Sequence, residues 1–589
     1  MKIISFAVNN FGCISGGLDK NRVCFDNSNT IFIFGQNNVG KSSFLKAYEF
    51  FYKSETPNLD DFFKTDIEKI LEFELEVELD SFDFSKIELV APSKKDSLKK
   101  WLREGKFLKV KREFGVTEDG KTQKIEKAKN STFNPSTNTW DDKCYGSIGL
   151  NGVFQACLPT PIFIKAMPTE EEVENIINQI LSAKAKNCLE VSELDELKSA
   201  QKTIQTLQEK MYNPTSIKSY KDQVNAHFKQ LFPETQIEIE EKDKIKWTEN
   251  ALGKKFNIKF EKIDTDGVKD ESIPSSYSKI GHGAIRSAMF ALLLMKDVAE
   301  EFERVDNRKD YLVLFEEPEL FLHPKLLKGL RSLIYKVSED TYPYQVLCAS
   351  HSPQMIDISK PKSSLGRMIK EEEQTTIFQI DEEDLQNAAD ATTKAELKEE
   401  LYEILRFNPF ICESFYADEV VLVEGPTEEI ILRGYLKSKE DEISKDLFIV
   451  NCGTVNNIPF FQKVFSKFHI KYHVICDTDS KPIKGTDSFG SPIFEEGVQK
   501  SIYEQLKIDQ DDSGYRVGIL RVHDTTFEVA HEDNSIPVEL RYIASDYNIS
   551  DGKPFNANRY WKDKLSSNLA HADIVKVPII SFLEEIINH

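Results

Sequence analysis

The chain has 589 residues, more than one hydrophobic core accommodates, so three or four domains are expected. Its net charge of −22 argues against binding polyanions over the whole surface, although bound divalent cations can reverse the field at a local site. The apolar runs are too short for a membrane span and the first residues lack a signal-peptide pattern, so we expect a cytoplasmic protein without membrane contact. Its 9 cysteines include no CxxC pair, which argues against a zinc ribbon or a disulfide framework.

Residues 1–167 are rich in strand patterns and contain one clear helix. A short apolar strand, residues 31–34, leads into Gly35-Gln36-Asn37-Asn38-Val39-Gly40-Lys41-Ser42, and a helix follows to residue 53. This stretch fits the phosphate-binding loop G-x-x-x-x-G-K-[ST] in its strand–loop–helix context. It predicts that ATP binds there, with Lys41 on the β- and γ-phosphates and the Ser42 hydroxyl on Mg²⁺. The predicted nucleotide-binding residues of this loop are Gly35, Asn37, Asn38, Gly40, Lys41, Ser42 and Ser43.

A basic segment, residues 94–112, surrounds Trp101 and Phe107 with lysines and arginines. Two interpretations remain open. The favoured one is a solvated face of a hairpin or helix, and the other is a path for DNA.

Residues 168–235 differ from the preceding segment, because Ile and Leu recur at helical spacing among Glu, Lys and Gln. This pattern predicts a helical insertion, in the simplest case an antiparallel pair of helices. An apolar face on a projecting element is most simply covered by its own copy, so we expect a homodimer or a dimer of dimers. The alternative is that the insertion folds back onto its own domain.

Strand patterns return in residues 236–380. An apolar strand at residues 312–315 ends in Glu316-Glu317-Pro318-Glu319. We expect Glu316 to hold the Mg²⁺ of the nucleotide and Glu317 to orient or deprotonate the attacking water. An exposed acid pair is the alternative. A further strand, residues 346–349, precedes His351, whose imidazole could contact a γ-phosphate.

This order of motifs resembles the ABC-type ATPase class that includes the SMC and RecF proteins. In that class a signature loop reaches across a dimer to the γ-phosphate of the other subunit. Gly281 and Gly283, which precede the helical residues 284–296, are the candidates for that loop.

A polar helical connector, residues 381–415, precedes a last domain, residues 416–589, in which strands alternate with helices as in a parallel α/β sheet. Two of its apolar strands end in acids: Glu424, Glu428, Asp477 and Asp479. Parallel strands would bring these carboxylates to one edge of the sheet. Mg²⁺ or Mn²⁺ would neutralise them, and two such ions can activate water and stabilise the leaving oxygen of a phosphodiester.

These acids resemble the motifs of the Toprim domain, together with Gly425 after the first of these strands and Gly453 after the strand at residues 448–450. An ABC-type head followed by Toprim resembles the OLD (overcoming lysogenization defect) family. The resemblance implies an α/β fold class, an ABC-type P-loop ATPase head with a helical dimerisation insertion and a Rossmann-like parallel Toprim sheet. It also implies Glu528 as an additional metal ligand and Lys564, or else Lys562, as the lysine that stabilises the transition state.

The family resemblance implies an ATP-binding, metal-dependent DNA endonuclease whose head regulates cleavage. Members act in bacterial defence against phage, some with a helicase partner (Gabija) and some beside a retron reverse transcriptase and its DNA–RNA product. The alternative hypothesis is a non-cleaving, ATP-dependent DNA-binding or repair clamp in which the Toprim acids only grip DNA.

Overall fold

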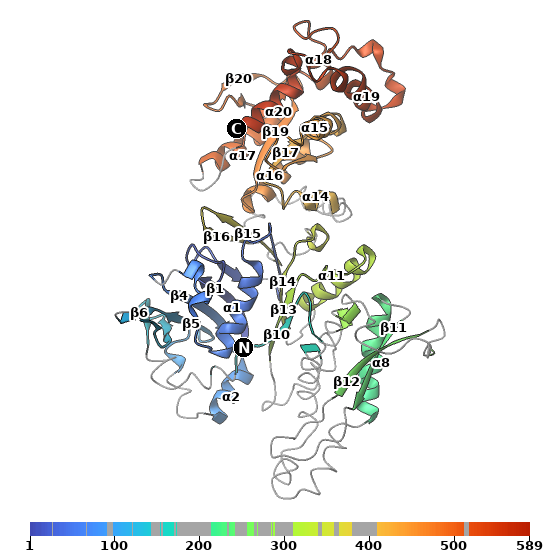
Figure 1. The fold of residues 1–589 in the computed structure, drawn as a ribbon. Helices are drawn as coiled ribbons and strands as arrows, with labels where there is room; N and C mark the ends of the chain where they lie inside the picture. Colours follow the sequence, from blue (N-terminus) through green and yellow to red (C-terminus); the bar gives the residue numbers. More distant parts are fainter. Residues whose placement is uncertain are drawn as a thin grey trace, which may run out of the picture. The chain divides into compact units, whose positions relative to one another are not determined.

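The computed structural model describes residues 1–25, 28–65, 68–90, 98–119, 122–142, 157–169, 214–231, 235–241, 256–263, 310–339, 344–357, 364–379, 409–511 and 518–589, with a few single residues between them. The chain divides into two compact units, Met1–Gln379 and Ile380–His589 (Figure 1). None of the helices in the described ranges is long and apolar enough to cross a membrane. The predicted signature glycines, Gly281 and Gly283, and nearly all of the connector lie outside these residues.

The first unit contains an antiparallel sheet in the order β2-β1-β4-β5-β8-β9. Its strands are β1 (Lys2–Asn9), β2 (Arg22–Cys24), β4 (Leu71–Glu78), β5 (Phe107–Phe114), β8 (Lys129–Asn134) and β9 (Thr139–Asp141). On β4 the predicted alternation is confirmed, because Leu71, Phe73, Leu75 and Val77 enter the core. A short hairpin, β6 (Val116–Asp119) and β7 (Thr122–Ile125), follows β5.

A second sheet in this unit has the order β10-β13-β14-β3-β15-β16 and is parallel except for its last strand. The strands are β3 (Thr30–Phe34), β10 (Thr160–Ile164), β13 (Tyr311–Glu316), β14 (Tyr344–Ala349), β15 (Leu365–Glu371) and β16 (Gln374–Gln379). Strand β14 therefore lies between β3, which leads into the phosphate-binding loop, and β13, which ends in the acidic motif. This order brings three sequence motifs to one edge.

Two helices flank the parallel sheet. Helix α1 (Lys41–Lys53) packs between the two sheets, where Phe44, Tyr48 and Phe51 join residues of both in one core. Helix α11 (Pro324–Glu339) packs against β14 and β3. Helix α2 (Ser81–Val90) follows β4.

Helix α8 (Pro214–Leu231) is the described part of the predicted insertion. It packs on β11 (Thr235–Glu241), which pairs with β12 (Phe256–Lys262), and it also contacts α11. The Asn225 side chain donates to the Ile237 carbonyl at 3.0 Å and accepts the Ile237 N–H at 2.7 Å. This helix thus folds back onto its own unit, while most of residues 170–213 lie outside the described part of the chain.

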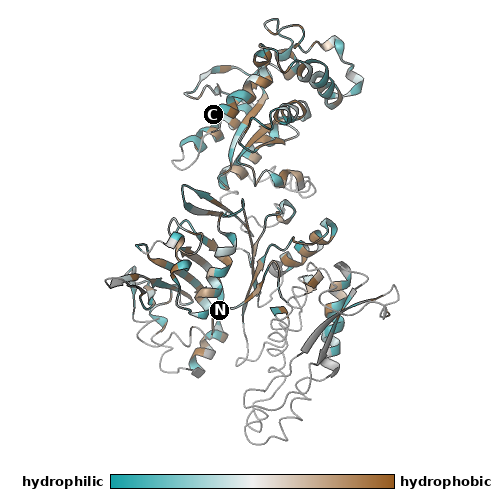
Figure 2. Cartoon of the chain, viewed as in Figure 1, coloured by the Kyte–Doolittle hydropathy of each residue, from teal (hydrophilic) through white to brown (hydrophobic). Residues whose placement is uncertain are grey.

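The second unit is built on a parallel sheet in the order β18-β17-β19-β22. Its strands are β17 (Glu419–Val423), β18 (Leu447–Asn451), β19 (Lys471–Asp477) and β22 (Leu520–His523). Figure 2 shows that these strands are apolar and that the helices around them carry mixed faces. A small hairpin, β20 (Ile483–Thr486) and β21 (Pro492–Phe494), follows β19.

Helices cover the sheet of the second unit. They are α14 (Pro409–Glu413), α15 (Pro426–Ser438), α16 (Ile458–Lys467), α17 (Gly497–Asp511), α18 (Phe527–His531), α19 (Lys553–Tyr560) and α20 (Pro578–Asn588). Helix α15 packs with α19 and α20 over one core, and α16 packs with α17. The predicted α/β fold class, a P-loop head followed by a parallel sheet, is confirmed.

Candidate functional site

The phosphate-binding loop follows β3 and is held in a shape that only glycine permits. Gly35 has φ 146°, and a Cβ there would lie 2.1 Å from the Met368 carbonyl oxygen of β15. Gly40, at φ 112°, directly precedes α1. Asn37 and Asn38 are exposed at the tip of the loop, and Ser42 and Ser43 lie half-buried in the first turn of α1. These residues surround one helix N-terminus, the arrangement that binds phosphate.

Lys41 is buried beneath this loop. Its ammonium donates to the carbonyl of Gly35 at 2.7 Å and to that of Gln36 at 2.6 Å. Burial lowers the Lys41 pKa to about 8, against the opposing effect of Glu319 and Glu317. These two carbonyl contacts hold the ammonium inside the loop. A bound phosphate could replace the carbonyl oxygens as its hydrogen-bond acceptor.

The acidic motif and the histidine lie at the neighbouring strand ends. Glu316 is the last residue of β13 and accepts the Ala166 N–H at 3.4 Å. Glu317, at φ 44°, lies 3.7 Å from the imidazole of His351 through its Oε1. Burial and then the charge of Lys41 lower the His351 pKa to about 4, so this imidazole is neutral near pH 7. Such a pair can orient a water molecule beside the phosphate loop.

Glu319 is a residue of this edge to which we assigned no role from the sequence. Its Oε1 accepts the backbone N–H of His351 at 2.6 Å, and its Oε2 accepts the Ser350 hydroxyl at 3.0 Å. Burial raises its pKa. Its place in the motif, two residues after Glu317, was the available signal.

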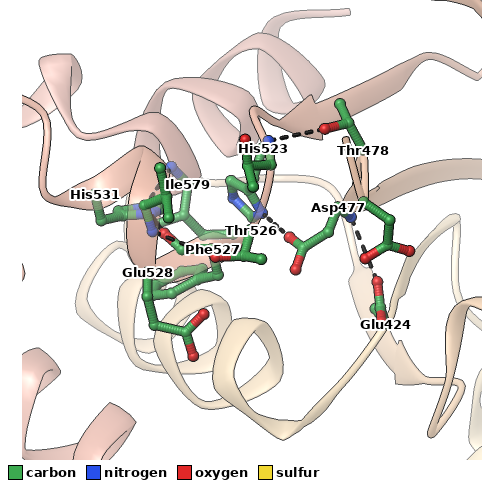
Figure 3. Close-up of polar contacts among 12 residues, drawn as sticks. Glu424, Asp477, Thr478, His523, Thr526, Phe527, Glu528, His531 and Ile579 are labelled. Carbon is green, nitrogen blue, oxygen red and sulfur yellow. Dashed lines mark hydrogen bonds and ion pairs between the residues drawn. The ribbon is translucent and has the colours of Figure 1, made fainter. Parts of the chain in front are cut away.

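In the second unit, the predicted acids converge where β17 and β19 end. These strands pair in parallel with Val423 opposite Ile475, so Glu424 and Asp477 follow at adjacent strand ends. The Asp477 N–H donates to Glu424 Oε2 at 3.4 Å (Figure 3). Glu428 lies buried in the first turn of α15.

Asp479 is exposed and has φ 50°. The buried Gln499 side chain of α17 donates to Asp479 Oδ2 at 3.1 Å and to the Asp477 carbonyl at 3.2 Å. Gln499 therefore holds the carboxylate of this turn in place. Gly453, at φ 80°, makes the turn after β18.

The pKa values show that these acids repel one another. Burial first, and then the charges of Asp477 and Glu424, raise the Glu428 pKa to about 8. Burial raises the Asp477 pKa to about 6, against a hydrogen bond from the Phe527 backbone. Because nearby carboxylates oppose ionisation of each other, a divalent cation with oxygen ligands fits this cluster.

A histidine that the sequence analysis missed completes this group. His523 ends β22, and its Nδ1 lies 3.1 Å from Asp477 Oδ1. One ligand atom each of Glu428, Asp477 and His523 lies within 4.8 Å of the other two. The sequence signal that could have revealed His523 was a short strand that ends in this polar residue, in the same domain as two strands that end in acids.

Glu528 and the predicted lysine have different outcomes. Glu528 lies in the first turn of α18, and its charge raises the pKa of Asp477. Lys564 does not join the acids but forms an ion pair with Asp546 at 3.3 Å. Lys562 lies in the same turn, Trp561–Leu565.

Lys553, at the start of α19, is the lysine that the structure brings to the acids. Its ammonium lies 3.5 Å from Glu528 Oε1. Its charge also lowers the pKa values of Glu424, Glu428 and Asp477. Lys553 is therefore a further candidate for the cation of this cluster, beside the predicted Lys564 and Lys562.

The basic segment lies on β5 and the turn before it, and its charges are balanced by β4. Lys106 pairs with Glu78 at 2.6 Å, and Lys109 with Glu74 at 2.8 Å. Arg103 likewise pairs with Glu76 at 2.7 Å. These cross-strand pairs favour the solvated hairpin face over the DNA path.

Together, a P-loop edge and an acidic parallel-sheet edge define a P-loop ATPase joined to a Toprim domain. Residues 1–356 match the family described as AAA ATPase domain, and residues 415–479 match the family described as overcoming lysogenization defect protein-like, TOPRIM domain. The chain thus belongs to the AAA ATPase domain family, in the OLD group that carries a C-terminal TOPRIM domain.

Two relatives and one solved structure are similar to this chain. The Old nuclease of Escherichia phage P2 is 24% identical over 469 residues, covering 76% of this chain and 73% of that protein. Endonuclease GajA of Bacillus cereus (strain VD045) is 22% identical over 542 residues, covering 87% and 78%. A solved Smc head bound to the C-winged helix domain of ScpA is 12% identical, covers 66% of this chain and 100% of that chain, and has a TM-score of 0.38.

Proposed function

We propose that the protein is a divalent-metal-dependent DNA endonuclease whose ATP-binding head regulates cleavage. The observation that carries this proposal is the convergence of Glu424, Glu428, Asp477 and Asp479, with Glu528 and Lys553, at the carboxyl edge of a parallel sheet. Relatives named Old nuclease and endonuclease GajA support it. From the family resemblance, we further propose a role in bacterial antiphage defence.

The residues of this cluster have different proposed roles, as metal ligands, as a cation and as a positioning residue. Glu428 would provide a buried oxygen ligand, Glu424, Asp477 and Glu528 half-buried ones, and Asp479 an exposed one. Divalent ions held there would supply charge neutralisation and activation of a water molecule. Lys553 is placed to stabilise the negative charge that develops on a phosphate oxygen. Gln499 holds Asp479 in position.

The direct test is cleavage of supercoiled and linear DNA by purified protein with Mg²⁺ or Mn²⁺. We expect activity with either ion, loss with EDTA, and loss in Glu424→Ala and Asp477→Ala. A matched control is Glu504→Ala, an exposed acid of α17 outside the cluster. Cleavage by Asp477→Ala at the wild-type rate would refute the assignment.

The head would bind ATP at the loop around Lys41, with the Mg²⁺ of the nucleotide near Ser42 and Glu316. We propose that it hydrolyses ATP through Glu317 and His351, which lie at the adjacent strand ends. Because the Toprim acids belong to the other unit, loss of ATP binding should change the regulation of cleavage and leave its chemistry intact.

We also propose a homodimer or a dimer of dimers. The support is the helical spacing of Ile and Leu in the insertion, residues 168–235, because an apolar face on a projecting element is most simply covered by a second copy. Light scattering on the full chain, and on a variant with 174–213 replaced by a Gly/Ser linker, tests this. A monomer at micromolar concentration in the wild type would refute it.

A further inference from the structure

His523 is buried at the edge of the acidic cluster. Its side chain has no exposed surface, and it is enclosed by the rings of Phe527, Phe582 and His531, with centroids 5.2, 5.4 and 5.1 Å away. Figure 3 shows its imidazole directed at the Asp477 carboxylate. The enclosing rings restrict rotation, so Nδ1 stays on the side of the acids.

The two ring nitrogens have different surroundings. Nδ1 lies 3.1 Å from Asp477 Oδ1, whereas Nε2 has no hydrogen-bond partner among the described residues. Burying a polar nitrogen without a partner is unfavourable, because its interactions with water are lost and not replaced. The neighbouring His531 is different, because its Nδ1 and Nε2 contact the Phe527 carbonyl at 2.8 Å and the Ile579 N–H at 3.2 Å. A polar side chain kept buried at such a cost suggests a function.

If His523 only oriented Asp477, its imidazole would need to contact the Asp477 carboxylate and no other acid. In this structure one imidazole nitrogen also lies within 4.8 Å of a carboxylate oxygen of Glu428. Ligands at about 2.1 Å from one octahedral ion are separated by roughly 3 Å when adjacent and 4.2 Å when opposite. The 3.1 Å between His523 Nδ1 and Asp477 Oδ1 matches two adjacent ligands, and the 4.8 Å limit on the distances to Glu428 exceeds the separation of opposite ligands by about 0.6 Å.

We propose that His523 supplies a nitrogen ligand, together with Asp477 and Glu428, to one divalent-metal position of the Toprim unit. An imidazole nitrogen favours transition-metal ions over Mg²⁺, which prefers oxygen ligands. This position therefore selects Mn²⁺ or a similar ion, whereas Asp479 and Glu528 offer oxygen alone. The inference rests on the proposed metal-dependent function and specifies the ligand set.

The test uses nucleotide-free, chelator-treated full-length protein with one equivalent of Mn²⁺. Pulsed electron paramagnetic resonance detects the ¹⁴N of a coordinated imidazole without any assay of cleavage. We expect a ¹⁴N modulation in the wild type and its replacement by the ¹⁵N pattern in protein labelled with ¹⁵N-histidine. The labelled wild type makes this readout independent of whether a variant folds.

Variants assign the signal. His523→Gln should remove the nitrogen modulation and weaken Mn²⁺ binding relative to Mg²⁺ by about tenfold. His571→Gln, which changes a histidine paired with Glu539 outside the cluster, should keep both properties.

Two failures are distinguishable. If Mn²⁺ binds, Asp477→Asn abolishes that binding and no nitrogen modulation appears, the role of His523 is refuted while the proposed function stands. If Asp477→Asn leaves Mn²⁺ binding unchanged, the metal site and the proposed function both fall.

Discussion

Glu319 accepts the backbone N–H of His351 at 2.6 Å and so joins the loop after β13 to the loop after β14. The imidazole of His351 in turn lies 3.7 Å from Glu317 Oε1. The position of His351 beside the phosphate-binding loop thus depends on Glu319, a half-buried acid for which the sequence predicted no contact with ATP.

Glu319→Ala should lower kcat for ATP hydrolysis about tenfold, because the His351 N–H loses its buried acceptor and the loop shifts. The KM for ATP should change less, since the phosphate loop is intact. Glu319→Gln keeps a carbonyl oxygen and should recover part of the rate. Steady-state phosphate release measures both constants, and equal kcat values in Glu319→Ala and wild type would contradict the positioning role.

Lys41→Ala should remove ATP binding, whereas Glu317→Gln should bind ATP and hydrolyse it about 100-fold more slowly. The first change removes the ammonium inside the loop, and the second removes a base without changing the shape of the site. Calorimetric titration with ATP and phosphate release separate the two effects. An unchanged ATP affinity in Lys41→Ala would refute the loop assignment.

Gly35→Ala should lower the Tm of the ATPase unit and abolish nucleotide binding. Its Cβ would lie 2.1 Å from the Met368 carbonyl, and the backbone there has φ 146°. Gly17→Ala is the matched control, because Gly17 belongs to the same unit, has φ 104°, and a Cβ there meets nothing within 4 Å. Scanning calorimetry on both variants is the measurement, and an equal Tm for the two would exclude a backbone clash.

Lys553→Ala should reduce DNA cleavage about 100-fold, the cost of losing one donor to a developing oxyanion. Lys564→Ala should reduce it far less, since that ammonium pairs with Asp546. Single-turnover cleavage at saturating Mg²⁺ compares them. The reverse order of effects would favour Lys564.

The contribution of His473 to the stability of the Toprim unit should fall as the pH decreases from 6.5 to 4, whereas the raised pKa values of Glu428 and Asp477 act in the opposite direction. His473 is neutral in the folded chain, because burial lowers its pKa from 6.5 to about 4 despite the opposing Glu419. In this window the unfolded chain binds a proton that the folded chain does not, so acid favours unfolding. The two contacts of His473, Nε2 to Glu419 Oε2 at 3.0 Å and Nδ1 to the Ile519 N–H at 3.1 Å, fit the neutral ring.

His473→Gln should make the dependence of Tm on pH shallower between 6.5 and 4. His523 and His531 also have lowered pKa values through burial, so part of the slope should remain. An identical slope in His473→Gln would show that this ring does not titrate on unfolding.

The sequence was sufficient where a local pattern carries the structure. The loop from Gly35 to Ser42 follows its strand and opens its helix within a few residues, so its shape is set locally. The proximity of Glu424 and Asp477 followed from one additional rule, that the ends of paired parallel strands meet.

Residues brought in by tertiary packing were not accessible in this way. His523 reaches Asp477 only because β22 pairs with β19, and Gln499 reaches Asp479 from a separate helix. Lys553, at the start of α19, had no local pattern that set it apart from Lys562 and Lys564 in the turn that follows this helix. Spacing along a chain does not reveal which turn of a helix faces a site.

The recognisable Toprim segment ends at residue 479, whereas the sheet that it belongs to does not. A fragment cut there would leave β19 as an open edge strand, because its partner β22 begins at Leu520. It would also lose His523, Glu528 and Lys553. A relative could therefore keep every residue of the matched segment and lose the residues after it. Such a relative would be inactive, although a sequence search would still classify it with active members.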